Sequence, residues 1–165
     1  MNEFETLYRH HAQDVYRFAL YLCGNRADAE DITSDTFVRA WNAGGTIRAA
    51  TAKAYLFTIA RNVYLQGLRR VVRQSPIEES LPDPGNDPQE SAEARAELGR
   101  VLKALQQMPE LDRTVLLLRV LETRPYEEIA LVTGLSLAAV KVKVHRARLK
   151  LAQLRAGHSS QEVSK

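Results

Sequence analysis

The chain has 165 residues, of which 45% are hydrophobic and 26% charged, and its formal net charge is +3. This length fits one ordinary domain or two small ones, which excludes a large multidomain enzyme. No stretch approaches the roughly 18 apolar residues that a membrane span needs, and no secretory signal is evident, so we expect no membrane insertion. The single cysteine, Cys23, excludes an internal disulfide and a cysteine zinc site. We therefore expect a reducing, cytoplasmic setting.

Charge is strongly segregated along the chain. Residues 42–77 and 136–160 contain no acid, whereas residues 78–97 carry seven acids and one arginine. Two basic segments separated by an acidic one suggest two contacts with a polyanion such as nucleic acid. Each basic segment taken alone is explained equally well as a solvated face.

The first part of the chain predicts three helices. Apolar residues recur at helical spacing from Phe4 to Leu22, and Gly24 ends that run. Asp28 is the expected cap of a second helix that extends to Trp41. A third helix is expected over about residues 51–73, with Leu56, Ile59, Val63 and Leu68 among its inward side chains.

Proline and acidic residues then predict a break in the fold. Four prolines lie between residues 76 and 88, and proline denies the helix its hydrogen bonds. We expect a flexible acidic linker over residues 74–92 between two small helical domains, 1–73 and 93–157. A long loop inside one domain is the alternative. No segment alternates as a strand does, so the predicted fold is all-α, with a disordered polar tail over residues 158–165.

Residues 126–148 predict a helix-turn-helix. Gly134 permits the turn, and Ser136 can cap the second helix. Val140 and Val144 would hold that helix on the core and leave its cations facing outward, where they fit the DNA major groove. The alternative is an ordinary helical hairpin with a basic face.

Catalytic patterns are weak. The third helix combines cations with aromatics, which suits melted DNA strands, although Tyr55 and Phe57 are equally consistent with core positions. Adjacent His10 and His11 point about a hundred degrees apart on a helix, so we expect no metal site. We also expect no catalytic residues and no cofactor.

Three motifs, in order along the chain, resemble a known family. They are Asp28-Ala29-Glu30-Asp31-Ile32-Thr33, then Tyr55-Leu56-Phe57 with Ile59-Ala60-Arg61-Asn62, then Tyr126-Glu127-Glu128-Ile129-Ala130 with Gly134-Leu135-Ser136. Over nearly its whole length the chain resembles bacterial RNA polymerase sigma factors of the extracytoplasmic-function (ECF) class. The resemblance implies a protein that binds core RNA polymerase, recognises the −10 and −35 elements of promoter DNA and initiates transcription. It also implies an anti-sigma protein as a partner.

The resemblance assigns three sets of contact residues. Those implied for polymerase binding are Asp31, Ser34, Asp35, Phe37, Arg39 and Trp41. Those implied for the −10 element are Lys53, Tyr55, Arg61, Asn62, Arg69 and Arg70. Those implied for the −35 element are Ser136, Ala139, Lys141, Lys143, His145, Arg146, Arg148 and Lys150.

Several positions depart from the family pattern. The family often has Gln at Ser34, Thr at Ala139 and Ser at Val142. The last two changes shift DNA reading from hydrogen bonds toward apolar contact, for example with thymine methyl groups.

Two other functions compete with the sigma factor. A stand-alone helix-turn-helix regulator would need no polymerase-docking motif, and a sigma-like mimic that only binds an anti-sigma protein would need no basic recognition helix. A nucleic-acid-processing enzyme is disfavoured because no catalytic pattern is present.

Overall fold

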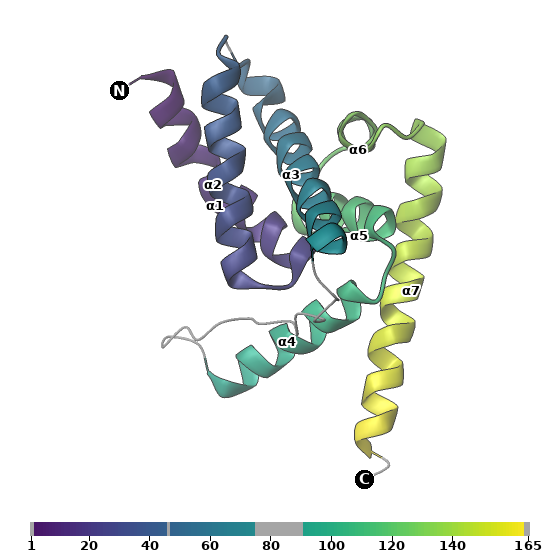
Figure 1. Ribbon diagram of the computed structural model, residues 1–165. Coiled ribbons are helices and arrows are strands. Elements are labelled where there is room, and N and C mark those ends of the chain that lie inside the picture. The colour runs from purple at the N-terminus through teal and green to yellow at the C-terminus, as the bar shows by residue number, and fades with distance from the viewer. Residues whose placement is uncertain (1, 46, 75–90, 164–165) are drawn as a thin grey trace.

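The computed structural model describes residues 2–45, 47–74 and 91–163 (Figure 1). All regular elements in these ranges are helical, which confirms the all-α prediction. Helices before the predicted linker form domain 1, and helices after it form domain 2.

Domain 1 is a bundle of three helices that pack pairwise (Figure 1). Its elements are α1 (Glu3–Cys23), α2 (Arg26–Ala43), the short 3-10 turn η1 (Ala49–Thr51) and α3 (Ala52–Gln74). Phe18 of α1 and Phe57 of α3 are completely buried, with ring centroids 5.1 Å apart. Leu68 was predicted to face inward, but it is 43% exposed, and residues 66–70 near the end of α3 are all exposed.

The α1–α2 corner shows how the local sequence sets the helix ends. Gly24 adopts a left-handed backbone, with φ of 79°, and ends α1 as predicted. The predicted cap of α2 was wrong: Asn25, not Asp28, is the cap. The extended backbone of Asn25 lets its side-chain oxygen accept a hydrogen bond from the Asp28 amide at 3.0 Å, and Asp28 lies in the first turn.

Domain 2 has four helices and one π-helical segment. They are α4 (Ala92–Gln106), α5 (Glu110–Leu116), the π-helical η2 (Leu117–Leu121), α6 (Tyr126–Thr133) and α7 (Leu137–Val163). The predicted disordered tail was wrong over residues 158–163, which continue α7. The continuation is permitted because Gly157 is a lone weak breaker and no proline follows it.

Helices α6 and α7 form the predicted helix-turn-helix. Gly134 ends α6 with φ of 75°, and its amide donates to the Ala130 carbonyl at 2.9 Å. Ser136 Oγ accepts from the Ala139 amide at 3.1 Å, so the predicted cap is confirmed. Val140 and Val144 are buried, as expected, and fix α7 on the domain 2 core.

The two domains pack against each other, which the sequence analysis did not predict. Helix α3 contacts α6, while α1 contacts α4, α5 and η2. Buried side chains of both domains belong to one hydrophobic cluster. The predicted linker falls largely on residues 75–90, which lie outside the described residues.

A buried arginine joins the two domains. Arg113 of α5 is only 5% exposed. Its guanidinium donates to the Leu22 carbonyl at the end of α1, to the Tyr64 hydroxyl of α3 and to the carbonyls of Leu105 and Met108. A buried charge is tolerated when its donors are satisfied in this way. Domain 2 therefore supplies the partner that the last turn of α1 lacks.

Replacing Arg113 with Met should lower the free energy of unfolding by about 3 kcal/mol, because four acceptors around the buried guanidinium each lose a hydrogen bond. Urea denaturation measures this loss. Arg100→Met is the matched control, since exposed Arg100 pairs with Glu97 of its own helix and the change should cost less than about 1 kcal/mol. Equal losses in the two variants would contradict the assigned role of Arg113.

Candidate nucleic-acid and protein interfaces

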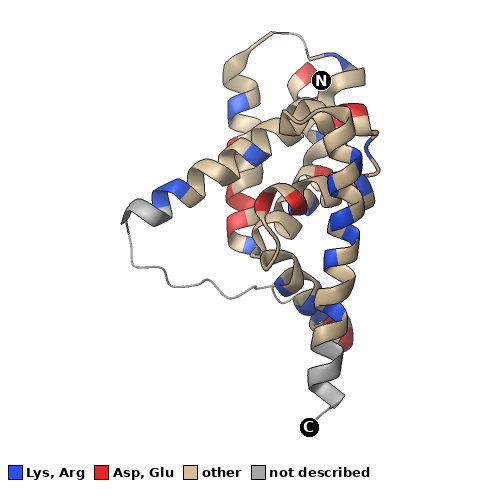
Figure 2. Cartoon of the chain, turned by 90° about the vertical axis from the view of Figure 1, so that its right-hand side faces the viewer, with Lys and Arg blue, Asp and Glu red and all other residues tan. Residues whose placement is uncertain are grey.

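The outward face of α7 carries most of the residues predicted for the −35 element. Lys141, His145, Arg146, Arg148 and Lys150 are all exposed. Figure 2 shows the run of Lys and Arg along this helix. The buried valines on the opposite face orient these cations away from domain 2. Such a basic helix, presented by a capped turn, can enter a DNA groove.

Lys143 is placed differently from its neighbours. Its Nζ lies 3.0 Å from Asp112 Oδ1 of α5, and its side chain is only 34% exposed. Ala139 is half-buried, and Ser136 is exposed but already caps the helix. Lys143 therefore joins α7 to α5 within domain 2.

Tyr126 at the start of α6 lies beside Lys141, and the sequence analysis did not single it out as a contact. The Arg119 guanidinium carbon is 4.2 Å from the centroid of the Tyr126 ring, and the Lys141 Nζ is 5.9 Å from it. Cations are attracted to the faces of aromatic rings at these distances. The ring thus holds Lys141 close to the helix-turn-helix junction.

The residues predicted for the −10 element divide into two groups on α3. Asn62, Arg69 and Arg70 are exposed. Lys53, Tyr55 and Arg61 are half-buried: Tyr55 packs against the core, and the two cations are ion-paired with carboxylates.

Arg61 is held by the other domain. Its Nε and a terminal nitrogen donate to the two carboxylate oxygens of Glu110 at 2.7 and 3.1 Å. Glu110 begins α5 of domain 2, so a predicted DNA contact of domain 1 is already occupied in this arrangement.

The predicted polymerase-binding residues also divide. Asp31, Ser34, Asp35 and Trp41 are exposed along one side of α2, as residues three or four apart on a helix should be. Val38 lies in the same stripe at 54% exposure. Val38 was not among the predicted docking residues, although its spacing from Ser34 and Trp41 places it in the stripe. We call these five residues the α2 stripe.

The two remaining predicted docking residues point elsewhere. Phe37 is 3% exposed, and its ring packs edge-to-face against Tyr8 with centroids 4.9 Å apart. Arg39 donates to the Gln66 side-chain oxygen of α3 at 2.7 Å. Both support the packing around α2 and lie outside the stripe.

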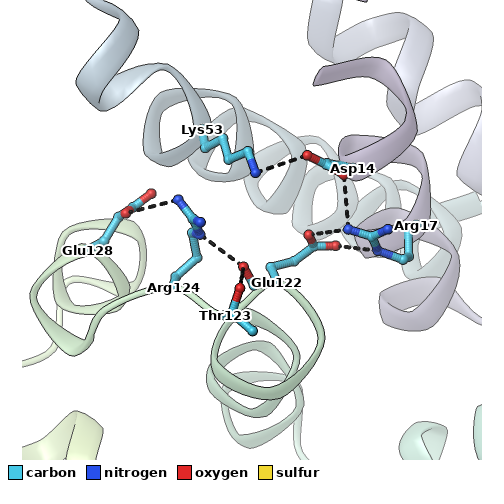
Figure 3. A network of polar contacts seen from close by, with 7 residues as sticks. All are labelled: Asp14, Arg17, Lys53, Glu122, Thr123, Arg124 and Glu128. Atoms are coloured by element: carbon cyan, nitrogen blue, oxygen red, sulfur yellow. Dashed lines mark hydrogen bonds and ion pairs between the residues drawn. The ribbon is translucent and has the colours of Figure 1, made fainter. Parts of the chain in front are cut away.

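A polar network at the domain boundary was also missed (Figure 3). Arg17 of α1 donates to both oxygens of Glu122, at 2.9 and 2.8 Å, and Glu122 is 3% exposed. Arg17 also pairs with Asp14 at 2.9 Å, and the other oxygen of Asp14 lies 3.1 Å from Lys53 Nζ. Arg17 and Glu122 are 105 positions apart, so no local pattern indicates the pair.

Burial and neighbouring charges shift the pKa values of Asp14, Glu110 and His11 near the domain boundary. Burial acts to raise the pKa of Asp14, but hydrogen bonding and charge from Lys53, with Arg17, lower it overall. Burial likewise acts to raise the pKa of Glu110, but hydrogen bonds from Arg61 and Thr114, together with nearby arginine charge, lower it overall. The pKa of His11 is lowered chiefly by burial and then by the charge of Lys53. Each carboxylate is therefore stabilised in its charged form.

No group of three or more His, Cys, Asp or Glu side chains in the described residues could hold a metal ion. Among the same residues, no helix is long and apolar enough to cross a membrane.

Comparison with known proteins places both domains in one family. Residues 7–74 match the family model of sigma-70 region 2, and residues 98–151 match that of sigma-70 region 4. The chain is 34% identical to the ECF RNA polymerase sigma factor SigL of Mycobacterium tuberculosis, over 90% of this chain and 89% of that protein. It is 35% identical to the ECF sigma factor SigE of Mycolicibacterium smegmatis over 98% of this chain, but spans only 65% of that relative's length.

Solved structures agree with this assignment. The sigma factor RpoE of Bartonella quintana, in complex with the anti-sigma factor NepR, superposes with a TM-score of 0.76 at 26% identity, covering 93% of this chain and 97% of that one. CnrH, in complex with the cytosolic domain of CnrY, gives a TM-score of 0.68 at 29% identity, covering 93% and 88%. The chain belongs to the ECF sigma factors of RNA polymerase, a family of non-enzymatic transcription initiation factors.

The Arg61–Glu110 ion pair should make the free energy of unfolding depend on pH in the acid range. Because the folded-state pKa of Glu110 lies below its ordinary value, the pair stabilises the fold above the unfolded-state pKa of about 4, and this contribution is lost as the pH falls through the folded-state value. The difference in unfolding free energy between the wild type and Glu110→Gln should thus be constant above about pH 5 and shrink below about pH 4. Urea denaturation from neutral to acid pH measures it. A constant difference across that range would contradict the pairing.

Proposed function

We propose that this protein is a promoter-specificity subunit that docks on core RNA polymerase and reads two separate DNA elements. One observation carries the proposal: a single chain presents both an exposed docking stripe on α2 and an outward basic helix on a capped helix-turn-helix. A transcription regulator that acts without polymerase needs only the second of these.

The α2 stripe has the chemistry of a protein-docking surface. Asp31 and Asp35 supply negative charge at one end, and the exposed side chains of Val38 and Trp41 supply apolar area at the other. Aromatic anchors contribute strongly to binding when a partner buries them, and charges at the rim steer the approach. A basic, partly apolar surface of core polymerase fits this stripe.

Helix α7 would read the −35 element in the major groove. Arg146 and Lys141 are placed to pair with guanine edges, while Arg148 and Lys150 bind phosphates. His145 lies on the same face, and Ala139 offers an apolar contact near the start of the helix. Lys143 contributes by anchoring the helix to Asp112.

Helix α3 would hold the melted −10 element. Exposed Asn62 lies at its middle, exposed Arg69 and Arg70 lie near its end, and half-buried Tyr55 lies near its start. An aromatic face beside cations suits unpaired bases, whose extrusion from the duplex costs a few kcal/mol.

A partner protein and a cellular location follow from the family. RpoE and CnrH were each solved in complex with another protein, and NepR is named an anti-sigma factor. We extend this to an anti-sigma partner for the present chain, and to a cytoplasmic location, where the polymerase works.

Asp31→Arg and Trp41→Ala should each weaken binding to core polymerase by at least about tenfold, because each removes one half of the docking chemistry. Co-elution and titration with purified core enzyme measure the effect. Arg146→Ala is the matched control and should leave core binding unchanged. Unchanged core binding in both stripe variants would remove the stripe from the docking surface.

Arg146→Ala and Lys143→Ala should separate DNA reading from helix anchoring. Loss of Arg146 should cost about 1–3 kcal/mol of promoter binding and relax the base preference at one −35 position. Loss of Lys143 should leave the base preference intact, because its Nζ pairs with Asp112. Binding to a library of −35 variants, measured with holoenzyme, distinguishes the two. An altered preference in Lys143→Ala would show that Lys143 leaves Asp112 to read DNA.

A further inference from the structure

Two arginines of domain 1 each form a bidentate ion pair with a carboxylate of domain 2. Arg17 donates two hydrogen bonds to Glu122, and Arg61 donates two to Glu110. Both are the parallel two-bond arrangement in which a guanidinium also binds a phosphate. The carboxylates therefore occupy positions that phosphate oxygens could fill.

Arg17 lies on the same surface as a residue already assigned to DNA. One oxygen of Asp14 pairs with Arg17 and the other with Lys53 (Figure 3). A single carboxylate thus holds the two cations side by side. Arg61 follows Lys53 by eight residues on α3, which is about 12 Å along the helix.

The packed arrangement cannot read both promoter elements at once, if the proposed function holds. The elements are centred about 25 base pairs apart, roughly 85 Å of B-form DNA. Here α3 packs on α6 and α6 packs on α7. Packed helices have axes about 8–10 Å apart, so the two DNA-reading helices, α3 and α7, are separated by only about 20 Å. The domains must therefore separate, and separation removes Glu110 and Glu122 from their arginines.

We propose that Arg17 and Arg61 exchange partners, binding Glu122 and Glu110 of domain 2 in the free chain and DNA phosphates in the promoter complex. This makes Arg17 a DNA-binding residue and the two glutamates a built-in block on DNA binding. The proposal rests on the proposed function for the identity of the DNA. The glutamates oppose premature binding because each phosphate must displace a carboxylate that is already in place.

The block is tested with the free full-length chain and a random-sequence DNA duplex of about 30 base pairs. Glu110→Gln/Glu122→Gln keeps the side-chain volumes and removes both charges. Two additional phosphate contacts steepen the slope of log binding constant against log salt concentration by about 1.8. Between about 50 and 200 mM salt, the variant should therefore lose roughly tenfold more affinity than the wild type does. The double variant should show this steeper slope and tighter binding at the lower salt concentration.

Glu3→Gln/Glu5→Gln is the matched control, since it removes the same charge from two exposed residues in the first turn of α1. Adding Arg17→Gln to the Glu110→Gln/Glu122→Gln variant should remove about half of the increase in the salt slope, because one of the two new phosphate contacts is lost. Identical slopes for the two double variants would overturn the block.

A second measurement keeps the proposal testable even if the double variant does not fold. In holoenzyme bound to its promoter, Arg17→Gln should lower the salt slope by about one. Arg100→Gln, an exposed arginine of domain 2, is the control and should not lower it. Equal slopes would overturn the assignment of Arg17 to DNA. Transcription by wild-type holoenzyme reports on the proposed function separately, so the two failures are distinguishable.

Discussion

The packing of domain 1 on domain 2 depends on one buried cation. The Arg113 guanidinium lies between the end of α1, the Tyr64 hydroxyl of α3 and two carbonyls of its own domain. An arginine whose donors are satisfied this way favours the packed geometry, since a shift would leave buried N–H donors without acceptors. Gln106 donates to the same Leu22 carbonyl at 3.0 Å. The last turn of α1 is thus completed by domain 2.

Around this buried contact the boundary becomes polar and more exposed. The side chain of Arg17 is 43% exposed, whereas its partner Glu122 is almost fully buried. The Arg61–Glu110 pair is partly buried on both sides. Partly exposed ion pairs contribute little net stability and are screened by salt. Such an interface can stabilise the packed domains and still allow them to separate when a polyanion and a large protein partner bind.

Local features of the fold were predictable from sequence, because they depend on residues a few positions apart. Gly134 and Ser136 identified the turn and the cap of α7, and the valines at positions 140 and 144 identified its buried face. The capping error at Asp28 was a shift of three residues. Disorder of residues 158–165 was predicted from their polarity alone, and polarity does not end a helix that contains no proline.

The candidate site was only partly predictable, because the orientation of a side chain depends on distant neighbours. Phe37 and Val38 are adjacent, but only Val38 is exposed, and Lys143 faces Asp112 while Lys141 faces outward. The contacts of Arg17 and Arg61 with domain 2 join residues 105 and 49 positions apart. No periodicity or motif in the sequence encodes such pairs.

Run-off transcription with purified core RNA polymerase and a library of genomic fragments tests whether this chain directs the polymerase to promoters. Adding this chain should yield discrete transcripts whose start sites share common −10 and −35 sequences, and core enzyme alone should yield none of them. Failure to produce any new transcript with protein shown to be folded and free of partners would contradict the account and would leave a DNA-binding protein that acts without polymerase.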